Sequence, residues 1–529
     1  MSSRYFLISF FICCVALIQA QPKNFTQIED ADEHFDNRNY LFAIKAYQNE
    51  LKKDPDNIKV KFKLGICYLY TRVSREEAIP YLEEVSRSPK VEPELWFYLG
   101  RAYHLNNQIE QAKSAYSKFI ELRPKDAADA KHYYSQCENA EKLMSNPANV
   151  TLQNLGELIN SEDPDYNPFI DRNENFLVFT SRRRENIGGK KVEVDGYRSS
   201  DILVSYMHEG NWQRARNAGR AVNTRLDEQV VGLRSDGLQM YVYLDHIDKF
   251  GDIYVAERSD EKAEFGKPKI FEGPINEKIE TSGCVSDDGS PLFFARRDKV
   301  DGTSDLYMSR WIPGGRWALP VRLPDVINTP YNEDYPYLTQ DGQYLYFSSE
   351  GHNSMGGYDL FRSKWDRETN TFSPPENLGY PINSTDDDRS ICVRADNQLA
   401  YISAYRPNGF GDLDIYRVKF NSAEPVIAIY TGQIFFGDTA KINQPKNYAL
   451  AIIVTSKDHK DEFTFVPNPR SGRFVMALPA GEYVLTCQTK GYAKFNAELT
   501  VTDMGERNAE RNFDIVLKKA KTTAPRQRK

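Results

Sequence analysis

The sequence has few of the residues that a chemical site would need. Cysteine is scarce, with 7 among 529 residues. Two of them lie in the N-terminal apolar segment, and the others are odd in number and widely spaced, which excludes a small disulfide framework. These are Cys67, Cys137, Cys284, Cys392 and Cys487. Histidine is as rare and has no metal-site spacing; its positions are His34, His104, His132, His208, His246, His352 and His459.

Catalytic loops are missing too. The segment 351–356 has the wrong spacing for a nucleophile elbow, and no glycine-rich loop could hold a phosphate. We therefore predict that the chain is not an enzyme, that it has no catalytic, metal or cofactor-binding residues, and that it needs no cofactor. Residues that bind partners stay unassigned.

An excess of positive charge is also absent. The formal net charge is −7, so electrostatics gives no reason to expect a nucleic-acid partner. We expect residues 1–20 to be a secretory signal peptide, because Arg4 precedes an apolar run that ends near Ala20. An uncleaved anchor and lipid attachment at Cys13 or Cys14 are alternatives. No later apolar stretch is long enough to span a bilayer.

A five-fold repeat occupies residues 149–420. Its clearest element is an aspartate followed by two apolar residues, and the aspartates are between 51 and 55 residues apart. They are Asp201, Asp252, Asp305, Asp359 and Asp414. Each is preceded by a turn and an apolar strand, as at Asp236-Gly237 and Asp341-Gly342, and such turns favour hairpins. Repeats of this length with about four strands each predict a five-bladed β-propeller.

Two further elements recur in each copy. One is a β-branched residue followed by an asparagine: Asn160, Asn223, Asn276, Asn328 and Asn383. The other is an acid eight residues before the turn: Asp165, Glu228, Glu280, Glu333 and Asp388. These acids could ring the channel and hold a cation, but recurrence in every blade favours a structural role in capping backbone N–H groups between adjacent blades. The aspartate of the Asp-apolar element is expected to bond the loop before its strand.

The phase of the repeat predicts how the ring closes. The last copy ends with the strand that starts at Asp414, so its outer strand is missing, whereas residues 150–155 form a spare strand before the first copy. We expect residues 150–155 to pair at the outer edge of the fifth blade, which would remove an open sheet edge.

The segment 24–145 has helical periodicity instead. Its clearest repeat carries the tetratricopeptide pattern: Trp96, Leu99, Gly100, Tyr103, Ala112, Tyr116 and Pro124. Two weaker copies precede it, and 126–143 reads as a capping helix. The groove of such an array usually holds a peptide or a partner's helix; the alternative is that the array only packs against its own propeller.

Residues 426–518 contain about seven alternating or apolar segments and predict a β-sandwich. The run from Leu478 to Tyr483 contains Pro-Ala-Gly and resembles carboxypeptidase-regulatory-like domains, which place such a turn between core strands. Residues 519–529 are basic and expected to be a disordered tail. The predicted fold class is thus multidomain α plus all-β: helical solenoid, five-bladed propeller and C-terminal sandwich.

The blades resemble the TolB-type propellers. The order of tetratricopeptide array, TolB-type propeller and regulatory-like sandwich resembles the PorE-like periplasmic proteins associated with type IX secretion, although the OmpA-like peptidoglycan-binding domain usual in that family is not found up to Lys529. The resemblance implies a non-enzymatic scaffold in the periplasm, attached to the outer membrane through envelope proteins and serving type IX secretion or gliding. Direct peptidoglycan binding is not expected. Alternatives are a ligand- or glycan-binding sensor and an unrecognised hydrolase.

Overall fold

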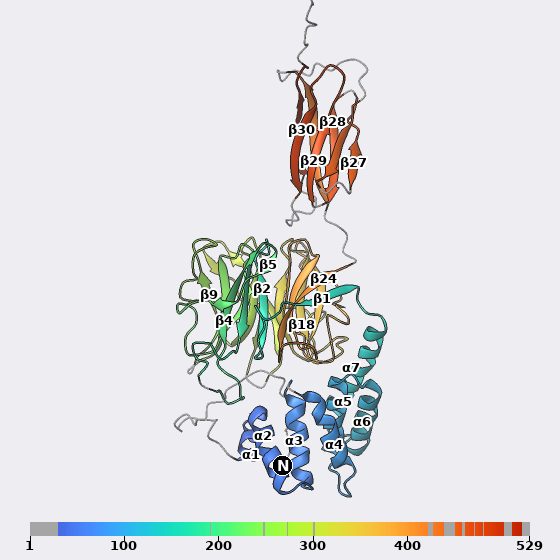
Figure 1. The fold of residues 1–529 in the computed structure, drawn as a ribbon. Helices are drawn as coiled ribbons and strands as arrows, with labels where there is room; N and C mark the ends of the chain where they lie inside the picture. Colours follow the sequence, from blue (N-terminus) through green and yellow to red (C-terminus); the bar gives the residue numbers. More distant parts are fainter. Residues whose placement is uncertain are drawn as a thin grey trace, which may run out of the picture. The chain divides into compact units, whose positions relative to one another are not determined.

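The computed structural model describes residues 30–72, 74–190, 192–246, 249–271, 273–299, 302–421, 427–437, 450–457, 461–469, 471–479, 481–501 and 510–520. They form two compact units, and the first ends at Asn421. This unit contains the helices and a ring of β-sheets; the second contains the C-terminal strands (Figure 1). The expected signal peptide, residues 1–20, lies outside the described residues, as do residues 521–529 of the expected tail.

Helices form the N-terminal part of the first unit. They are α1 (Ala31–Asp36), α2 (Tyr40–Lys53), α3 (Ile58–Tyr70), α4 (Ala78–Ser86), α5 (Glu94–Leu105), α6 (Ile109–Leu122) and α7 (Ala128–Ser145), with a 3-10 turn η2 at Arg75–Glu77. Asn39 and Asn57 cap α2 and α3 by accepting backbone N–H groups of the first turn. No helix in the described part of the chain is long and apolar enough to cross a membrane.

Small residues let the helix pairs cross closely. A Cβ atom placed on Gly100 of α5 would lie 2.6 Å from the ring of Tyr116 on α6. One on Gly65 of α3 would lie 2.8 Å from Leu82 of α4. Tyr116 and Leu82 are fully buried in these crossings. The predicted tetratricopeptide solenoid is therefore confirmed, and its glycines act by steric fit rather than by backbone freedom.

Five antiparallel sheets, the blades, follow the helices. Blade one contains β2 (Asp165–Ile170), β3 (Phe176–Ser181), β4 (Asp201–His208), β5 (Asn211–Trp212) and β6 (Arg216–Asn217). Blade two contains β7 (Glu228–Leu233), β8 (Gln239–His246), β9 (Lys249–Glu257) and β10 (Lys269–Ile270). Blade three contains β11 (Ile279–Val285), β12 (Leu292–Arg297), β13 (Ser304–Ser309) and β16 (Val321–Arg322), with a side hairpin of β14 (Trp311–Ile312) and β15 (Arg316–Trp317).

Blade four contains β17 (Glu333–Leu338), β18 (Tyr344–Ser349), β19 (Asp359–Asp366), β20 (Thr371–Phe372) and β21 (Glu376–Asn377). Blade five contains β22 (Ile391–Val393), β23 (Leu399–Ala404), β24 (Asp414–Phe420) and β1 (Val150–Asn154). The first strands of neighbouring blades contact one another, so they form the inner wall of the ring. The five-bladed propeller is confirmed.

The strand that closes the ring is β1. It pairs antiparallel with β24, with Val150 opposite Phe420 and Asn154 opposite Tyr416. This is the pairing that the phase of the repeat requires. Since β1 precedes blade one in the chain, the two ends of the ring are held by a backbone ladder, and the edge of β24 is covered.

The recurrent asparagines join each blade to the one before it. Each side-chain amide donates to the carbonyl and accepts from the N–H of the residue after the recurrent aspartate, at 2.7–3.1 Å. The pairs are Asn160 with Ile415, Asn223 with Ile202, Asn276 with Ile253, Asn328 with Leu306, and Asn383 with Leu360. An amide of this shape satisfies two backbone groups at once, which explains why the residue recurs.

The second unit is a sandwich of two sheets, as predicted. One contains β25 (Ile427–Phe436), β28 (Arg473–Pro479), β31 (Glu510–Asn512) and β32 (Ile515–Leu517); the other contains β26 (Ile452–Ser456), β27 (Glu462–Phe465), β29 (Gly481–Cys487) and β30 (Phe495–Val501). The segment expected as one last strand is two, because Asp514 interrupts the ladder and accepts the N–H of Gln433. Lys519 still forms a bridge with Tyr492, so ordered pairing extends into the expected tail.

Candidate functional site

The five recurrent acids have structural partners inside their own blades, and not between adjacent blades as the sequence predicted, because the nearest free N–H groups lie in the loop that leads into the same strand. Four accept the backbone N–H of the residue four positions earlier, at 2.6–3.1 Å. These are Asp165, Glu228, Glu333 and Asp388. Glu280 instead accepts from Lys278 N–H and from Arg296 at 2.7 Å. The described residues contain no group of three or more His, Cys, Asp or Glu side chains that could hold a metal ion.

Burial changes the titration of these acids. It raises the pKa of Glu228, Glu280 and Glu333 to about 7 in each case. Hydrogen bonds partly oppose the effect, and for Glu280 the charge of Arg296 opposes it first. The recurrent aspartates bond the preceding loops as expected in three blades: Asp201 accepts from Ile187 N–H, Asp359 from Met355 N–H and Asp414 from Phe410 N–H. In blade three Asp305 pairs with Arg322 instead, at 2.8 Å.

The helical array is docked on the propeller by a buried arginine. Arg72 follows α3, and its guanidinium lies 3.3 Å from Asp412, 3.4 Å from Asp386 and 3.6 Å from Asp387. Arg75 pairs with the other oxygen of Asp386. Burial alone would raise the pKa of Asp386, but the charges of Arg75 and Arg72 outweigh it and hold this pKa below its ordinary value. The array and blade five thus share one charge cluster, with Arg72 only 10% exposed.

A second set of contacts joins the array to blade four. The His104 ring lies 3.0 Å from the carbonyl oxygen of Met355, and Gln136 donates to Ser354 Oγ at 2.9 Å. His132 stacks on Tyr331 with 3.9 Å between ring centres. Burial lowers the pKa of His104 to about 3 and that of His132 to about 4, so both rings are neutral near pH 7. The array therefore packs against its own propeller at these residues, and the binding of a partner in its groove stays a prediction.

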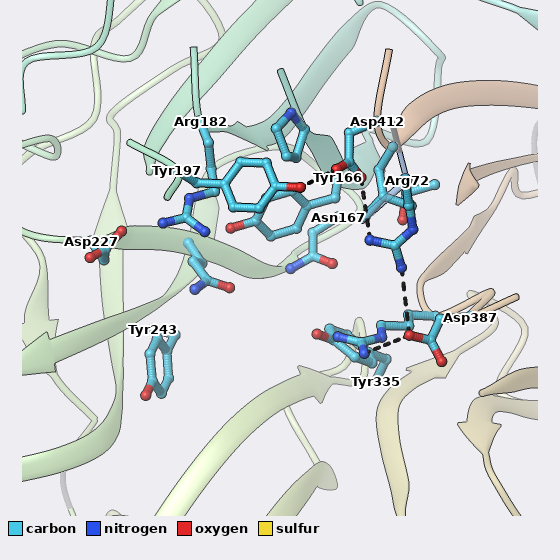
Figure 2. Close-up of a pocket in the computed structure, with 15 residues that line it drawn as sticks. Arg72, Tyr166, Asn167, Arg182, Tyr197, Asp227, Tyr243, Tyr335, Asp387 and Asp412 are labelled. Carbon is cyan, nitrogen blue, oxygen red and sulfur yellow. Dashed lines mark hydrogen bonds and ion pairs between the residues drawn. The ribbon is translucent and has the colours of Figure 1, made fainter. Parts of the chain in front are cut away.

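A cavity lies where the docked array meets the inner wall of the ring. Its wall takes Arg72 from the array and residues from blades one, two, four and five (Figure 2). The side chains that line it are mostly aromatic or polar and include Tyr166, Asn167, Arg182, Tyr197, Asp227, Gln229, Tyr243, Tyr335, Asp387, Arg389 and Asp412. The volume open to the centres of water molecules is about 100 Å³, room for roughly seven to ten waters.

Two residues of the cavity have an uncommon backbone conformation. Asn167 has φ +54° and Tyr335 has φ +51°. Each lies two positions after the recurrent acid of its blade, where the ladder between the first two strands shifts register. Such a bulge re-aims a side chain, and a left-handed conformation in a large residue is unfavourable. The inner strands of blades one and four therefore hold strained residues at the cavity wall, as binding sites often do.

The arginines of the wall are paired with carboxylates. Arg182 pairs with Asp195 at 2.6 Å and Arg389 with Asp387 at 2.9 Å. Tyr197 donates to Asp412 at 2.6 Å (Figure 2). Sequence reasoning gave packing of the array on the propeller as an alternative but named none of the residues at the junction, and it missed the cavity. The available signal was the run Asp386-Asp387-Asp388, of which only the last belongs to the repeat; the first two meet an arginine more than 300 residues away in the chain.

Comparison with known proteins places one segment in a family. Residues 93–126 match the Tetratricopeptide repeat. A human protein, "Superkiller complex protein 3", is 28% identical over 99 residues, which is 18% of this chain and 6% of that protein. The chain therefore matches only a small part of the length of this curated relative.

Several solved structures resemble the chain weakly. TolB from Acinetobacter baumannii is 14% identical, covers 56% of this chain and 72% of its own, and has a TM-score of 0.32. The TolB of Agrobacterium tumefaciens is 14% identical over 63% and 98%, with a TM-score of 0.30. The α-L-arabinofuranosidase PaAbf62A of Podospora anserina, solved with cellotriose, is 13% identical over 50% and 92%, also at 0.30. Scores this low assign no function. Since some of these proteins are glycoside hydrolases, the absence of enzyme activity here stays a prediction.

Proposed function

We propose that this protein is a non-enzymatic scaffold in the periplasm, attached to the outer membrane through partner proteins, and that it serves a type IX secretion or gliding complex. The observation that carries the scaffold role is the docking of the helical array on the propeller. Arg72, Arg75, His104 and Gln136 place buried polar contacts across this junction. A junction of this kind presents two recognition surfaces in a defined arrangement, which suits an adaptor better than it suits a soluble catalyst.

The protein-interaction part of the proposal is supported by the tetratricopeptide repeats. Arrays of this kind present an extended binding surface with little flexibility, because each repeat packs on its neighbour. Three parts of the proposal rest on the resemblance of the domain order to PorE-like proteins. They are the periplasmic location, the attachment to the outer membrane and the role in type IX secretion.

The experiment is crosslinked co-purification from native envelopes, followed by mass spectrometry. Three chains would be compared: the full protein, one lacking residues 21–140, and one lacking residues 427–529. We expect outer-membrane or secretion-complex proteins to accompany the full chain and a subset to be lost with each deletion. Recovery of the protein alone, or the same partners from every deletion, would contradict a scaffold. Recovery from the cytoplasmic fraction would contradict the proposed address.

A further inference from the structure

The cavity between the array and the inner wall of the ring is not needed to explain docking. Docking uses one side of it, through Arg72, Asp387 and Asp412. The opposite side, formed by the first strands of blades one and two, contributes Asn167 and Gln229 and no contact that the docking requires. The charge and hydrogen-bonding capacity of the side chains around the cavity decide which ligand it can hold.

The arginines of the wall leave no demand for an anionic ligand. The guanidinium groups of Arg72, Arg182 and Arg389 each have at least one carboxylate partner within 3.6 Å. An anion would have to compete with these carboxylates, and a cation beside Asp227 would be opposed by the charge of Arg182, which interacts with Asp227. A neutral ligand keeps every pair intact, and breaking a buried pair is strongly unfavourable.

Hydrogen-bonding capacity remains on the blade-one and blade-two side. Within the described residues, the Gln229 amide has no hydrogen-bond partner, and Asn167 uses only its Nδ2, which donates to the Val230 carbonyl at 3.2 Å. Asp227 uses one oxygen, which accepts from the N–H and hydroxyl of Ser200. Asn167 is 1% exposed and points into the hollow between Tyr166 and Tyr335 (Figure 2). The unused groups are two amide oxygens, one amide NH₂ and one carboxylate oxygen, which together suit hydroxyl groups that both donate and accept.

Tyrosines supply the apolar part of the wall. Tyr166, Tyr197, Tyr243 and Tyr335 line the cavity. The hydroxyl of Tyr197 is held by Asp412, which fixes the ring in place. Rigid aromatic faces with a few converging polar groups are the usual composition of a small-molecule site. The space, about 100 Å³ open to water centres, matches a ligand of about a dozen non-hydrogen atoms rather than a chain.

We propose that this cavity binds a single neutral sugar ring, with its hydroxyls on Gln229, Asn167 and Asp227 and its apolar face on the tyrosines. The left-handed backbone of Asn167 and Tyr335 serves this site, since it is what directs both side chains to the cavity. The site is independent of the scaffold role, and each can fail without the other.

The test is ligand-observed saturation-transfer NMR on the full chain. The probes are glucose, galactose, mannose and N-acetylglucosamine, with choline and inorganic phosphate as probes of the cationic and anionic classes. A ligand of this size is expected to bind with a dissociation constant on the order of millimolar. We expect at least one sugar to bind, and choline and phosphate not to compete with it.

Two variants locate the site. Gln229→Leu removes the unused amide and should weaken sugar binding by about five- to tenfold. If Gln229→Leu does not fold, Asn167→Gly takes its place, because glycine tolerates the positive φ at this position. Asn167→Gly should weaken sugar binding by a similar factor. The matched control is Gln239→Leu, on the second strand of the same blade, where Gln239 donates to the exposed Glu257; it should bind sugar normally. The proposal fails if no sugar binds at about 50 mM, if the first two variants bind as tightly as the control, or if only choline or phosphate binds.

Discussion

In the helical array each helix packs on its neighbour in the chain, whereas in the ring of blades the last strand pairs with one that precedes the first blade. The array is stabilised mainly by apolar crossings such as Gly100 against Tyr116. The ring adds hydrogen bonds from an asparagine side chain to the backbone at every blade boundary, such as Asn160 with Ile415. Damage to the array should therefore stay local, and damage to the closing strand should spread round the ring.

The largest effect is expected from removing residues 146–156. This deletes β1, exposes the edge of β24 and leaves Asp414 without Asn154, which donates to it at 2.8 Å. We expect loss of the cooperative propeller transition, an effect comparable to the total stability of a domain, about 5–15 kcal/mol. Thermal unfolding followed by circular dichroism measures it. The comparison chain lacks residues 21–140 but keeps β1, and its propeller should remain folded; equal melting of the two chains would remove the contrast between array and ring.

Gly100→Trp should disrupt the array and spare the ring. The new side chain would overlap the buried ring of Tyr116, 2.6 Å from the first added atom, and we expect a loss of about 3 kcal/mol, the upper end for overpacking. Hydrogen exchange resolved by segment should show faster exchange in α5 and α6 only. Lys52→Trp, at an exposed position of α2, is the control. Faster exchange in all five blades would show that the two regions unfold together.

Arg72→Leu should loosen the junction itself. Asp386, Asp387 and Asp412 would lose a shared cation, but each keeps another partner: Arg75, Arg389 and Tyr197. We therefore expect the junction to lose about 2–3 kcal/mol of stability, which is less than the loss for a buried charge left without any partner. Limited proteolysis measures this loss as a greater protease susceptibility of the array relative to the ring. Arg87→Leu removes an exposed pair with Glu83 and should change nothing measurable; equal effects of the two variants would show that burial at the junction does not matter.

Acidification should separate the thermal unfolding of the array from that of the ring. The folded pKa of His104 lies near 3, below its ordinary value, so the docked array loses stability as pH falls below about 6.5, by up to about 2 kcal/mol at pH 5. The pKa of Glu333 is raised to about 7, so the folded ring binds more protons than the unfolded chain and gains stability as pH falls from about 7 toward 4.5.

Array and ring should therefore melt in one transition near pH 7 and in two transitions, the array first, near pH 5. Melting curves at the two pH values measure this. His104→Gln keeps a donor for the Met355 carbonyl without the titration, so it should reduce the separation, while His132 and Glu333 still titrate. An unchanged separation in this variant would show that His104 does not contribute to it.

Local chemistry was enough to predict the repeats. Gly100 and Tyr116 mark a close helix crossing, and Asp-Gly pairs mark hairpins. Five copies of a β-branched residue followed by an asparagine mark five blades. Each feature could be predicted because it is set by residues close in sequence. Even the closing strand could be predicted, since counting strands in a closed ring fixes which one is missing. The role of each asparagine could not, because its partner lies in another blade.

The junction and the cavity were decided only by tertiary structure. Arg72 meets Asp386, Asp387 and Asp412 because the ring brings two loops of blade five to the end of α3, and nothing in the spacing of these residues records that distance. The cavity needs side chains from four blades and from the segment that follows α3, and the bulges that aim Asn167 and Tyr335 into it depend on pairing between strands. The sequence by itself determined which repeats form; the ring's closure and the array's docking determined which side chains meet, because contacts between distant segments arise only when the whole chain has folded.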